Sequence, residues 1–247
     1  MVIIFPMAGE SRRFQDAGYT LPKYELPLAG QSVFRHAVRS FSHYFQSAQF
    51  LFVHRTGADV FVQAECKALG IKKFDLVEVR RTTRGQAETV QVGLEAASIS
   101  DRETIAIFNI DTFRPGLRFP PLSFLMSVGG YLEVFKGSGP NWSYVRPSSE
   151  HPSRAIETSE KVQISDLCCT GLYYFQKAGD FKKCLSNDLN ADAGGSSSEL
   201  YVAPLYNHLI KAGTPIGYYE INREDVIFCG IPIEYENLRK TGKSRDE

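Results

Sequence analysis

The sequence predicts a three-layer α/β/α fold around a mostly parallel, mixed central sheet, with an antiparallel extension in the second half. Two observations lead to this fold class. In the first half, short apolar runs alternate with helical patterns, and this order requires parallel strands joined by crossover helices. In the second half, strand-like runs follow one another with short connections, which favours antiparallel pairing.

The elements of the first half follow from apolar runs and helical periodicity. Its predicted strands are residues 2–7, 49–54, 74–79 and 104–110. The first helix begins after a Ser32 N-cap and presents apolar residues on one face as far as Phe41. A second helix covers residues 59–69 and stops at Gly70, and a third covers residues 87–97.

The second half contains the predicted extension of the sheet. Its strands are residues 129–135, 142–146, 154–164 and 170–175. A polar loop at 187–198 precedes a helix at 199–212 that Gly213 ends, and the charged tail at 240–247 is expected to fray. Without an internal repeat or a clear linker, residues 1–247 are predicted to form one domain.

Composition favours a globular enzyme without net charge, in which cations that bind phosphate must be clustered at one site. The 28 Lys and Arg residues equal the 28 Asp and Glu residues, so no overall field attracts nucleic acid or an anionic membrane. No apolar run reaches the length of a membrane span, and no basic leader precedes the first strand, so we expect a cytoplasmic protein. The five cysteines lack C-x-x-C spacing, which indicates reduced thiols rather than a disulfide framework or structural zinc.

The loop after the first strand has the layout of a triphosphate site. Small residues, Ala8 and Gly9, leave room for a nucleotide at the strand end, where ligands of open α/β sheets bind. Arg13 offers a rigid fork of donors for phosphate oxygens, and Lys23 offers a mobile charge behind the stiff Pro22. The alternative is an ordinary strand and turn with surface cations. Two cations and a proline at this spacing favour phosphate binding.

This segment resembles the signature of the sugar-phosphate nucleotidyltransferases, roughly M-A-G-x-G-S-R-F, a spacer, and P-K. Ser11 stands where the family usually has a second glycine, and Arg12 where a small residue is common, so both narrow the loop. The resemblance implies a Rossmann-like fold and transfer of a nucleotidyl group with release of pyrophosphate. It assigns Arg13 and Lys23 to catalysis, and it assigns the small residues of the loop to nucleotide binding: Ala8, Gly9 and Ser11.

A carboxylate at the end of the fourth predicted strand suggests a metal site. Asp111 would face the crevice that holds Arg13, and magnesium prefers one or two carboxylates together with phosphate oxygens. The resemblance implies that Asp111 holds the Mg²⁺ that bridges the nucleotide and the sugar phosphate. The other interpretation is a turn aspartate before Pro115. Relatives carry a second metal-binding aspartate near the position of Cys229, and Asp225 is the candidate for that role here.

Two further segments complete the predicted site. The resemblance implies that Gln86 reads the base beside Gly85, although both residues could simply start a helix. It also implies that Lys161 contacts the phosphate of the acceptor. Glu160-Lys161 could equally be a solvated hairpin tip. The weaker candidates for the acceptor pocket are Glu160, Thr170 and Gly171.

The predicted function is to join a nucleoside triphosphate, with a pyrimidine base favoured, to a sugar-1-phosphate or similar metabolite for surface polysaccharide synthesis. Residues 1–128 would bind the nucleotide and 129–247 the acceptor, and formation of a homo-oligomer stays open. A glycosyltransferase of related fold would lack the Arg13 and Lys23 set, and a nicotinamide-dependent oxidoreductase would need G-x-G-x-x-G after the first strand. A noncatalytic nucleotide-sugar-binding protein is the remaining alternative, because Ser11, Cys229 and Ile231 depart from the family pattern.

Overall fold

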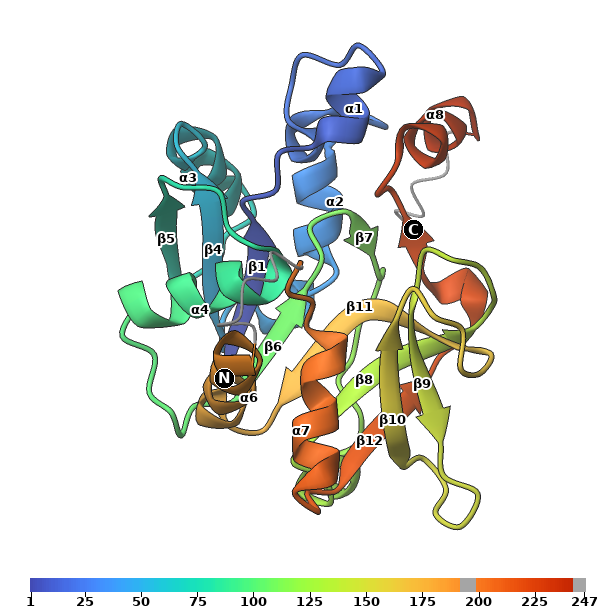
Figure 1. Ribbon diagram of the computed structural model, residues 1–247. Helices are drawn as coiled ribbons and strands as arrows, with labels where there is room; N and C mark the ends of the chain where they lie inside the picture. The colour runs from blue at the N-terminus through green and yellow to red at the C-terminus, as the bar shows by residue number, and fades with distance from the viewer. Residues whose placement is uncertain (192–198, 242–247) are drawn as a thin grey trace.

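The central feature of the molecule is one large mixed sheet (Figure 1). The computed structural model describes residues 1–191 and 199–241. Within these ranges the sheet has nine strands, and its main path runs β10-β9-β11-β6-β1-β4-β5, with β8 beside β11 and β12 beside β8. The strands are β1 (Val2–Met7), β4 (Gln49–Arg55), β5 (Phe74–Val79), β6 (Ile105–Phe108), β8 (Gly130–Lys136), β9 (Ser143–Pro147), β10 (Ala155–Glu160), β11 (Leu167–Phe175) and β12 (Ile216–Glu220).

The first half of the chain forms the parallel part of this sheet. Strand β1 pairs in parallel with β4 and with β6, and β4 pairs in parallel with β5. Alternate residues of β1 enter different cores: Ile4 packs on one face of the sheet, and Ile3 and Phe5 pack on the other. A sheet with both faces covered requires such apolar strands, so the parallel α/β half that the sequence predicts is confirmed.

The second half extends the sheet with antiparallel pairs. Strand β11 is antiparallel to β6, β8 and β9, while β12 joins β8 in parallel. Two short ladders lie outside the large sheet. They are β2 (Pro27–Leu28) with β3 (Gln31–Ser32), and β7 (Thr112–Phe113) with β13 (Ile227–Phe228). The second ladder joins the chain after β6 to the C-terminal segment, so it brings two distant parts of the sequence to the same edge.

Helices cover both faces of the sheet. Helices α4 (Gln86–Ala96), α6 (Ala178–Ala191) and α7 (Tyr206–Lys211) contribute residues to one core, and α2 (Val33–Arg39) and α3 (Asp59–Ala68) contribute to the other. The Ser32 N-cap is confirmed, because its side chain accepts the backbone N–H of Arg35 at 3.1 Å. The remaining helices are α1 (Arg12–Asp16), α5 (Leu122–Met126) and α8 (Pro232–Thr241).

The C-terminal third differs from prediction in several places, and helix α6 itself was not predicted. Helix α6 runs on to Ala191, so the first residues of the predicted loop at 187–198 are helical, and residues 192–198 lie outside the described part. The predicted helix at 199–212 is shorter, because residues 199–201 are irregular and Pro204 disfavours an α conformation before it. The chain there starts with a 3₁₀ turn at Ala203–Leu205.

Helix α8 was not predicted, and it lies beside α1 in Figure 1. The Tyr235 ring contacts the ring of Phe14 at 6.1 Å between centroids, and the Tyr19 hydroxyl donates to Glu236. These contacts tie the C-terminal helix to the loop that follows β1. Of the tail predicted to fray, residues 240–241 belong to α8 and residues 242–247 lie outside the described part.

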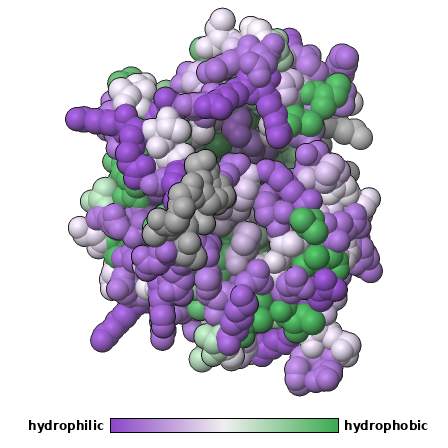
Figure 2. All heavy atoms as spheres, in the orientation of Figure 1, coloured by the Kyte–Doolittle hydropathy of each residue, from purple (hydrophilic) through white to green (hydrophobic). Residues whose placement is uncertain are grey.

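The surface is mainly polar. Figure 2 shows a face dominated by hydrophilic residues, with hydrophobic residues gathered in small patches. Among the described residues, none of the helices combines the length and the apolar character needed to span a bilayer. All five cysteines are buried and unpaired, as predicted.

Candidate active site

A cavity of about 760 Å³ opens where the loops after β1 and β6 meet the second half of the chain. Strands β1 and β6 are parallel neighbours, so their carboxyl ends lie at the same edge of the sheet. The cavity is lined by residues of both halves, and most of the predicted site residues are among them. These are Ala8, Gly9, Arg13, Lys23, Gly85, Gln86, Asp111, Glu160, Lys161, Thr170 and Gly171. The lining does not include Ser11 or Asp225.

The loop after β1 is held by its backbone and by one buried ring. Ser11 has φ 55°, in the left-handed region that favours glycine, which explains why a second glycine is usual at this position in the family. Its hydroxyl accepts the backbone N–H of Lys23 at 3.4 Å. Phe14 is buried and anchors α1, so Arg13 next to it projects from a fixed turn into the cavity. Ser11 therefore supports the loop from outside the lining.

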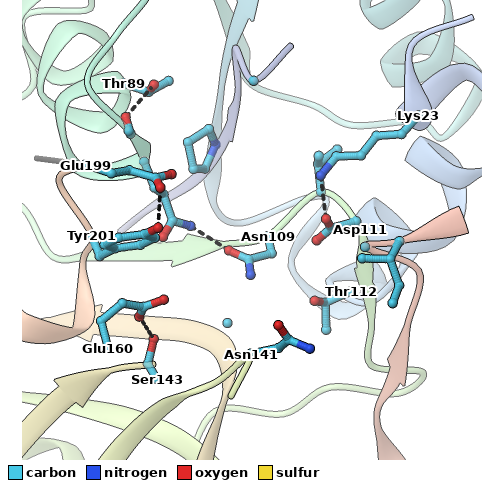
Figure 3. Close-up of a pocket in the computed structure, with 18 of the residues that line it drawn as sticks. Lys23, Thr89, Asn109, Asp111, Thr112, Asn141, Ser143, Glu160, Glu199 and Tyr201 are labelled. Atoms are coloured by element: carbon cyan, nitrogen blue, oxygen red, sulfur yellow. Dashed lines mark hydrogen bonds and ion pairs between the residues drawn. The ribbon is translucent and has the colours of Figure 1, made fainter. Parts of the chain in front are cut away.

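Lys23 and Asp111 form an ion pair at one side of the cavity (Figure 3). Their side chains are 24% and 17% exposed, respectively, so both charges are partly withdrawn from water. The carbonyl oxygen of Asp111 accepts the backbone N–H of Cys229 at 2.8 Å, which fixes the turn after β6 against the C-terminal segment. The ion pair and this hydrogen bond thus connect three segments that are remote in sequence.

A second carboxylate, Glu234 of α8, lies near Asp111. A methyl group added at Gly230 would lie 3.2 Å from Asp111 Oδ2 and 3.8 Å from Glu234 Oε2, so Gly230 leaves a gap between the two acids. Burial raises the pKa of Glu234, although its Oε2 accepts the N–H groups of Gly230 and Ile231. The position of Glu234 at the third residue of a helix would have been the only sequence signal for it.

These acids fit a magnesium ion better than a transition metal. Among residues 1–191 and 199–241, no group of three or more His, Cys, Asp and Glu side chains is arranged to hold a metal. Magnesium keeps several waters and needs only one or two carboxylates beside substrate phosphates, which matches Asp111 with Glu234 nearby. The ion pair of Lys23 with Asp111 is compatible with a magnesium ion, because Lys23 can contact a phosphate group while Asp111 contacts the metal.

Asp225 does not take the place predicted for it. Its carboxylate accepts a hydrogen bond from Asn222 at 3.3 Å, and its carbonyl oxygen accepts one from the buried Arg114 at 3.1 Å. Both contacts lie away from the cavity lining. The prediction that Asp225 is a metal ligand is therefore corrected, because the short ladder between β7 and β13 brings Gly230 and α8, rather than Asp225, to Asp111.

Gly85 and Gln86 lie at the start of α4, and each has a protein partner. A methyl group at Gly85 would lie 2.7 Å from the carbonyl oxygen of Leu200, and its φ is 132°, so the glycine admits the Leu200 backbone. The Gln86 amide donates to Asn109 Oδ1 at 2.5 Å (Figure 3). Asn109 precedes Asp111 by two residues, so Gln86 reaches toward the end of the cavity that holds Asp111.

Gly171 and Thr170 support the floor of the cavity. A methyl group at Gly171 would lie 2.5 Å from Asn109 Nδ2, so this glycine, with φ 98°, makes room for the asparagine. Thr170 is buried, and its hydroxyl donates to Glu133 at 3.0 Å. Glu133 also accepts Arg114 Nε at 3.0 Å. Thr170 therefore makes a hydrogen bond, and Gly171 a packing contact, within the wall of the cavity.

The opposite side of the cavity carries Glu160 and Lys161 (Figure 3 labels Glu160). Burial raises the pKa of Glu160, which accepts a hydrogen bond from Ser143. Lys161 has φ 59°, and its ammonium group donates to the Tyr201 hydroxyl. Lys161 lines the cavity, and its side chain is 49% exposed, so it stays open to water there.

Several lining residues were not predicted, among them Asn109, Glu199 and Tyr201. Asn109 could have been found from its place at the end of an apolar strand, beside Asp111. Glu199 and Tyr201 offered no local signal, since their segment was expected to be helical. Contacts with the start of α4 bring residues 199–201 to the cavity. One of these contacts is the hydrogen bond from the backbone N–H of Leu200 to the carbonyl oxygen of Arg84, at 2.6 Å.

Comparisons with known proteins agree with this site. The chain is 45% identical to the nucleoside-diphosphate-sugar pyrophosphorylase from Vibrio cholerae RC9, with 96% of this chain and 99% of that chain covered and a TM-score of 0.90. Similar folds, at low identity, occur in a putative glucose-1-phosphate thymidylyltransferase from Bacillus anthracis (15% identity, 100% and 96% covered, TM-score 0.76) and in the inositol-1-phosphate CTP transferase from T. maritima (16%, 99% and 96%, TM-score 0.70).

No protein-family model matches the chain, and no curated protein matches it either. The similarity to the Vibrio cholerae protein extends over nearly the full length of both chains. Proteins that are this similar in sequence belong to one family. The similarity agrees with the N-terminal motif and with the mixed α/β sheet. The chain therefore belongs to the sugar-phosphate nucleotidyltransferases, the family of the nucleoside-diphosphate-sugar pyrophosphorylases.

Proposed function

We propose that this protein transfers a nucleotidyl group from a nucleoside triphosphate to a phosphorylated polar metabolite, with a sugar-1-phosphate as the expected acceptor. One observation carries the proposal: a single cavity collects Arg13, Lys23, Asp111 and Lys161, which the sequence spreads over almost 150 residues. Cations from both halves of the chain, gathered in one cavity with Asp111, suit two anionic substrates that must approach each other.

In the reaction, a phosphate oxygen of the acceptor attacks the α-phosphorus in line. A new phosphorus–oxygen bond forms to the acceptor, the bond to the bridging oxygen breaks, and pyrophosphate leaves with that bond's electron pair. No general base is required, because the acceptor phosphate is already ionised at neutral pH. Catalysis then depends on positioning and charge stabilisation.

The residues have separate tasks in this scheme. Arg13 stabilises charge on the triphosphate, and Lys23 guides its phosphates from the opposite side of the same loop. Lys161 holds the acceptor phosphate. Asp111, with Glu234 nearby, would hold magnesium, which supplies charge neutralisation on the phosphate oxygens when bound.

We further propose that residues 1–128 serve mainly the nucleotide and residues 129–247 the acceptor. The triphosphate loop and the segment of Gly85 and Gln86 belong to the first part, and Lys161 belongs to the second. A pyrimidine base is the favoured assignment, because Gln86 has an amide that can contact a base edge. A role in surface polysaccharide synthesis is favoured on the family resemblance. The expected location is the cytoplasm.

The test is a matrix of triphosphates against phosphorylated metabolites, read as released pyrophosphate with purified protein. The panel includes the triphosphates of cytidine, uridine, thymidine and adenosine, and sugar-1-phosphates beside other phosphorylated polar compounds. Pyrophosphate release that requires one triphosphate and one acceptor together supports the proposal. Tight binding of a nucleotide sugar with no turnover in any combination would instead support a noncatalytic binding protein.

A further inference from the structure

We propose that Tyr201 is a positioning residue that holds the ammonium group of Lys161 in place for the acceptor phosphate. The inference rests on the proposed function, since it explains how the acceptor cation of that reaction is oriented. It concerns a residue that the sequence placed in a helix and that the structure places in the cavity lining.

The contacts between the two side chains are specific. Lys161 Nζ donates to the Tyr201 hydroxyl, and the same nitrogen lies 4.5 Å from the centroid of the Tyr201 ring. The Lys161 backbone is in the left-handed region at φ 59°, and its N–H donates to the Trp142 carbonyl oxygen at 2.9 Å. A long, flexible side chain on a fixed backbone thus donates one hydrogen bond and makes one cation–π contact at its end.

Glu199 determines the direction of the Tyr201 hydroxyl. The hydroxyl donates its single proton to the Glu199 carboxylate, which can only accept. A lone pair of the phenol oxygen is therefore turned toward Lys161. Burial and the bond to Glu199 raise the pKa of Tyr201, so the phenol keeps the proton that this arrangement needs. Lys161 uses one of its three donors for Tyr201 and has two others for phosphate oxygens.

The segment 199–201 is held by the nucleotide half of the chain. Between Glu199 and Tyr201, the buried Leu200 donates to the Arg84 carbonyl oxygen at 2.6 Å and accepts the Ala87 N–H at 3.0 Å. Gly85 lies between these two partners and has no room for a side chain against Leu200. Tyr201 therefore connects the Lys161 side chain to the loop that precedes α4.

The charge of Arg13 also reaches Tyr201. The pKa of the Tyr201 phenol is lowered by Arg13 against the larger effects of burial and Glu199. Arg13 and Tyr201 both line the cavity, so the triphosphate loop and the segment that holds Lys161 face the same space.

The experiment removes only the hydroxyl, with Tyr201→Phe, and measures both Michaelis constants with the substrates found in the screen. We expect the constant for the acceptor to rise about tenfold, the net effect of one hydrogen bond, and the constant for the triphosphate to stay unchanged. In a Lys161→Ala background, Tyr201→Phe should have no further effect, because Tyr201 acts through Lys161. Tyr218→Phe on β12, outside the cavity lining, is the matched control.

The same variants are also titrated with inorganic phosphate by calorimetry, a measurement that needs no turnover. Weaker phosphate binding in Tyr201→Phe, absent in the Lys161→Ala background, supports the positioning role whether or not pyrophosphate is released. Unchanged constants and unchanged phosphate affinity in Tyr201→Phe overturn it and leave the proposed function intact. An effect of Tyr201→Phe that persists in full without Lys161 also overturns it. Wild-type protein that releases no pyrophosphate contradicts the proposed function alone.

Discussion

The ammonium group of Lys23 is paired with the carboxylate of Asp111 at one side of the cavity, although 88 positions separate the two residues in sequence. Each neutralises the other while both are partly shielded from water. A triphosphate with magnesium offers both groups new partners of the right charge. Without substrates, the protein thus holds one positive and one negative group side by side. In the proposed reaction, the triphosphate brings negative charge to Lys23 and magnesium brings positive charge to Asp111.

The first prediction concerns the two cations of the N-terminal loop. Arg13→Ala and Lys23→Ala should each lower turnover about a hundredfold or more, because each removes a contact to charge that develops in the transition state. Arg13 is exposed and Lys23 is not part of a hydrophobic core, so both variants should fold. Single-turnover kinetics and circular dichroism check the two statements. Arg102→Ala, at an exposed turn outside the cavity, should behave as wild type, and near-normal turnover in the Arg13 variant would remove the central premise.

The second prediction concerns magnesium. Asp111→Asn keeps the shape of the side chain but removes the charge that a hard cation prefers, so the magnesium concentration for half-maximal rate should rise sharply. A chelator should abolish the wild-type rate, and added magnesium should restore it. Direct binding of Mn²⁺, followed by paramagnetic resonance, should weaken in the same variant. Asp166→Asn, with its carboxylate 64% exposed elsewhere on the surface, is the control. A wild-type rate that ignores the chelator would contradict the metal role.

The third prediction concerns Gly171. Its φ of 98° and the Asn109 side chain 2.5 Å from an added methyl group make Gly171→Ala costly in two ways. Gly116→Ala is a matched control, because Gly116 has φ 69° and open space around it. The control should lose about 1–2 kcal/mol of unfolding free energy from backbone strain alone. Gly171→Ala should lose clearly more in chemical denaturation, and equal losses would show that Asn109 simply moves away.

The fourth prediction concerns the pH dependence of stability. Burial raises the pKa of Glu160 in the folded protein above its ordinary value of 4.5. A raised carboxyl pKa stabilises the folded state fully below the unfolded pKa, and this contribution is lost as the pH rises through the folded pKa. Glu160→Gln has no charge to bury, so its stability relative to wild type should be higher at pH 7 than at pH 4.

Chemical denaturation at the two pH values measures this difference. Glu157→Gln on the same strand, with a side chain 47% exposed, is the comparison and should show a smaller change between the two pH values. If the relative stability of Glu160→Gln were the same at both, the carboxyl group would not be shielded from water in the folded protein.

Local sequence signals predicted much of the first half and the N-terminal motif. Apolar alternation in β1, the Ser32 cap and the glycine after α3 all act within a few residues, so they were visible without the fold. The prediction was poorer where local and long-range effects compete. Helix α8 begins at the proline of a Gly-Ile-Pro segment that resembles a loop, and residues 199–201 were assigned to a helix that packing against α4 does not allow.

By itself, the sequence determined which chemical groups are present and roughly where each strand ends, because periodicity and turn residues depend on neighbours along the chain. Only the tertiary structure decided that Asp225 lies outside the cavity, that Glu234 lies near Asp111, and that Tyr201 holds Lys161. These relationships depend on the pairing of β7 with β13 and of residue 200 with the start of α4. Such pairings join segments more than a hundred residues apart, and the hydrogen bonds that fix them leave no periodic trace in either segment.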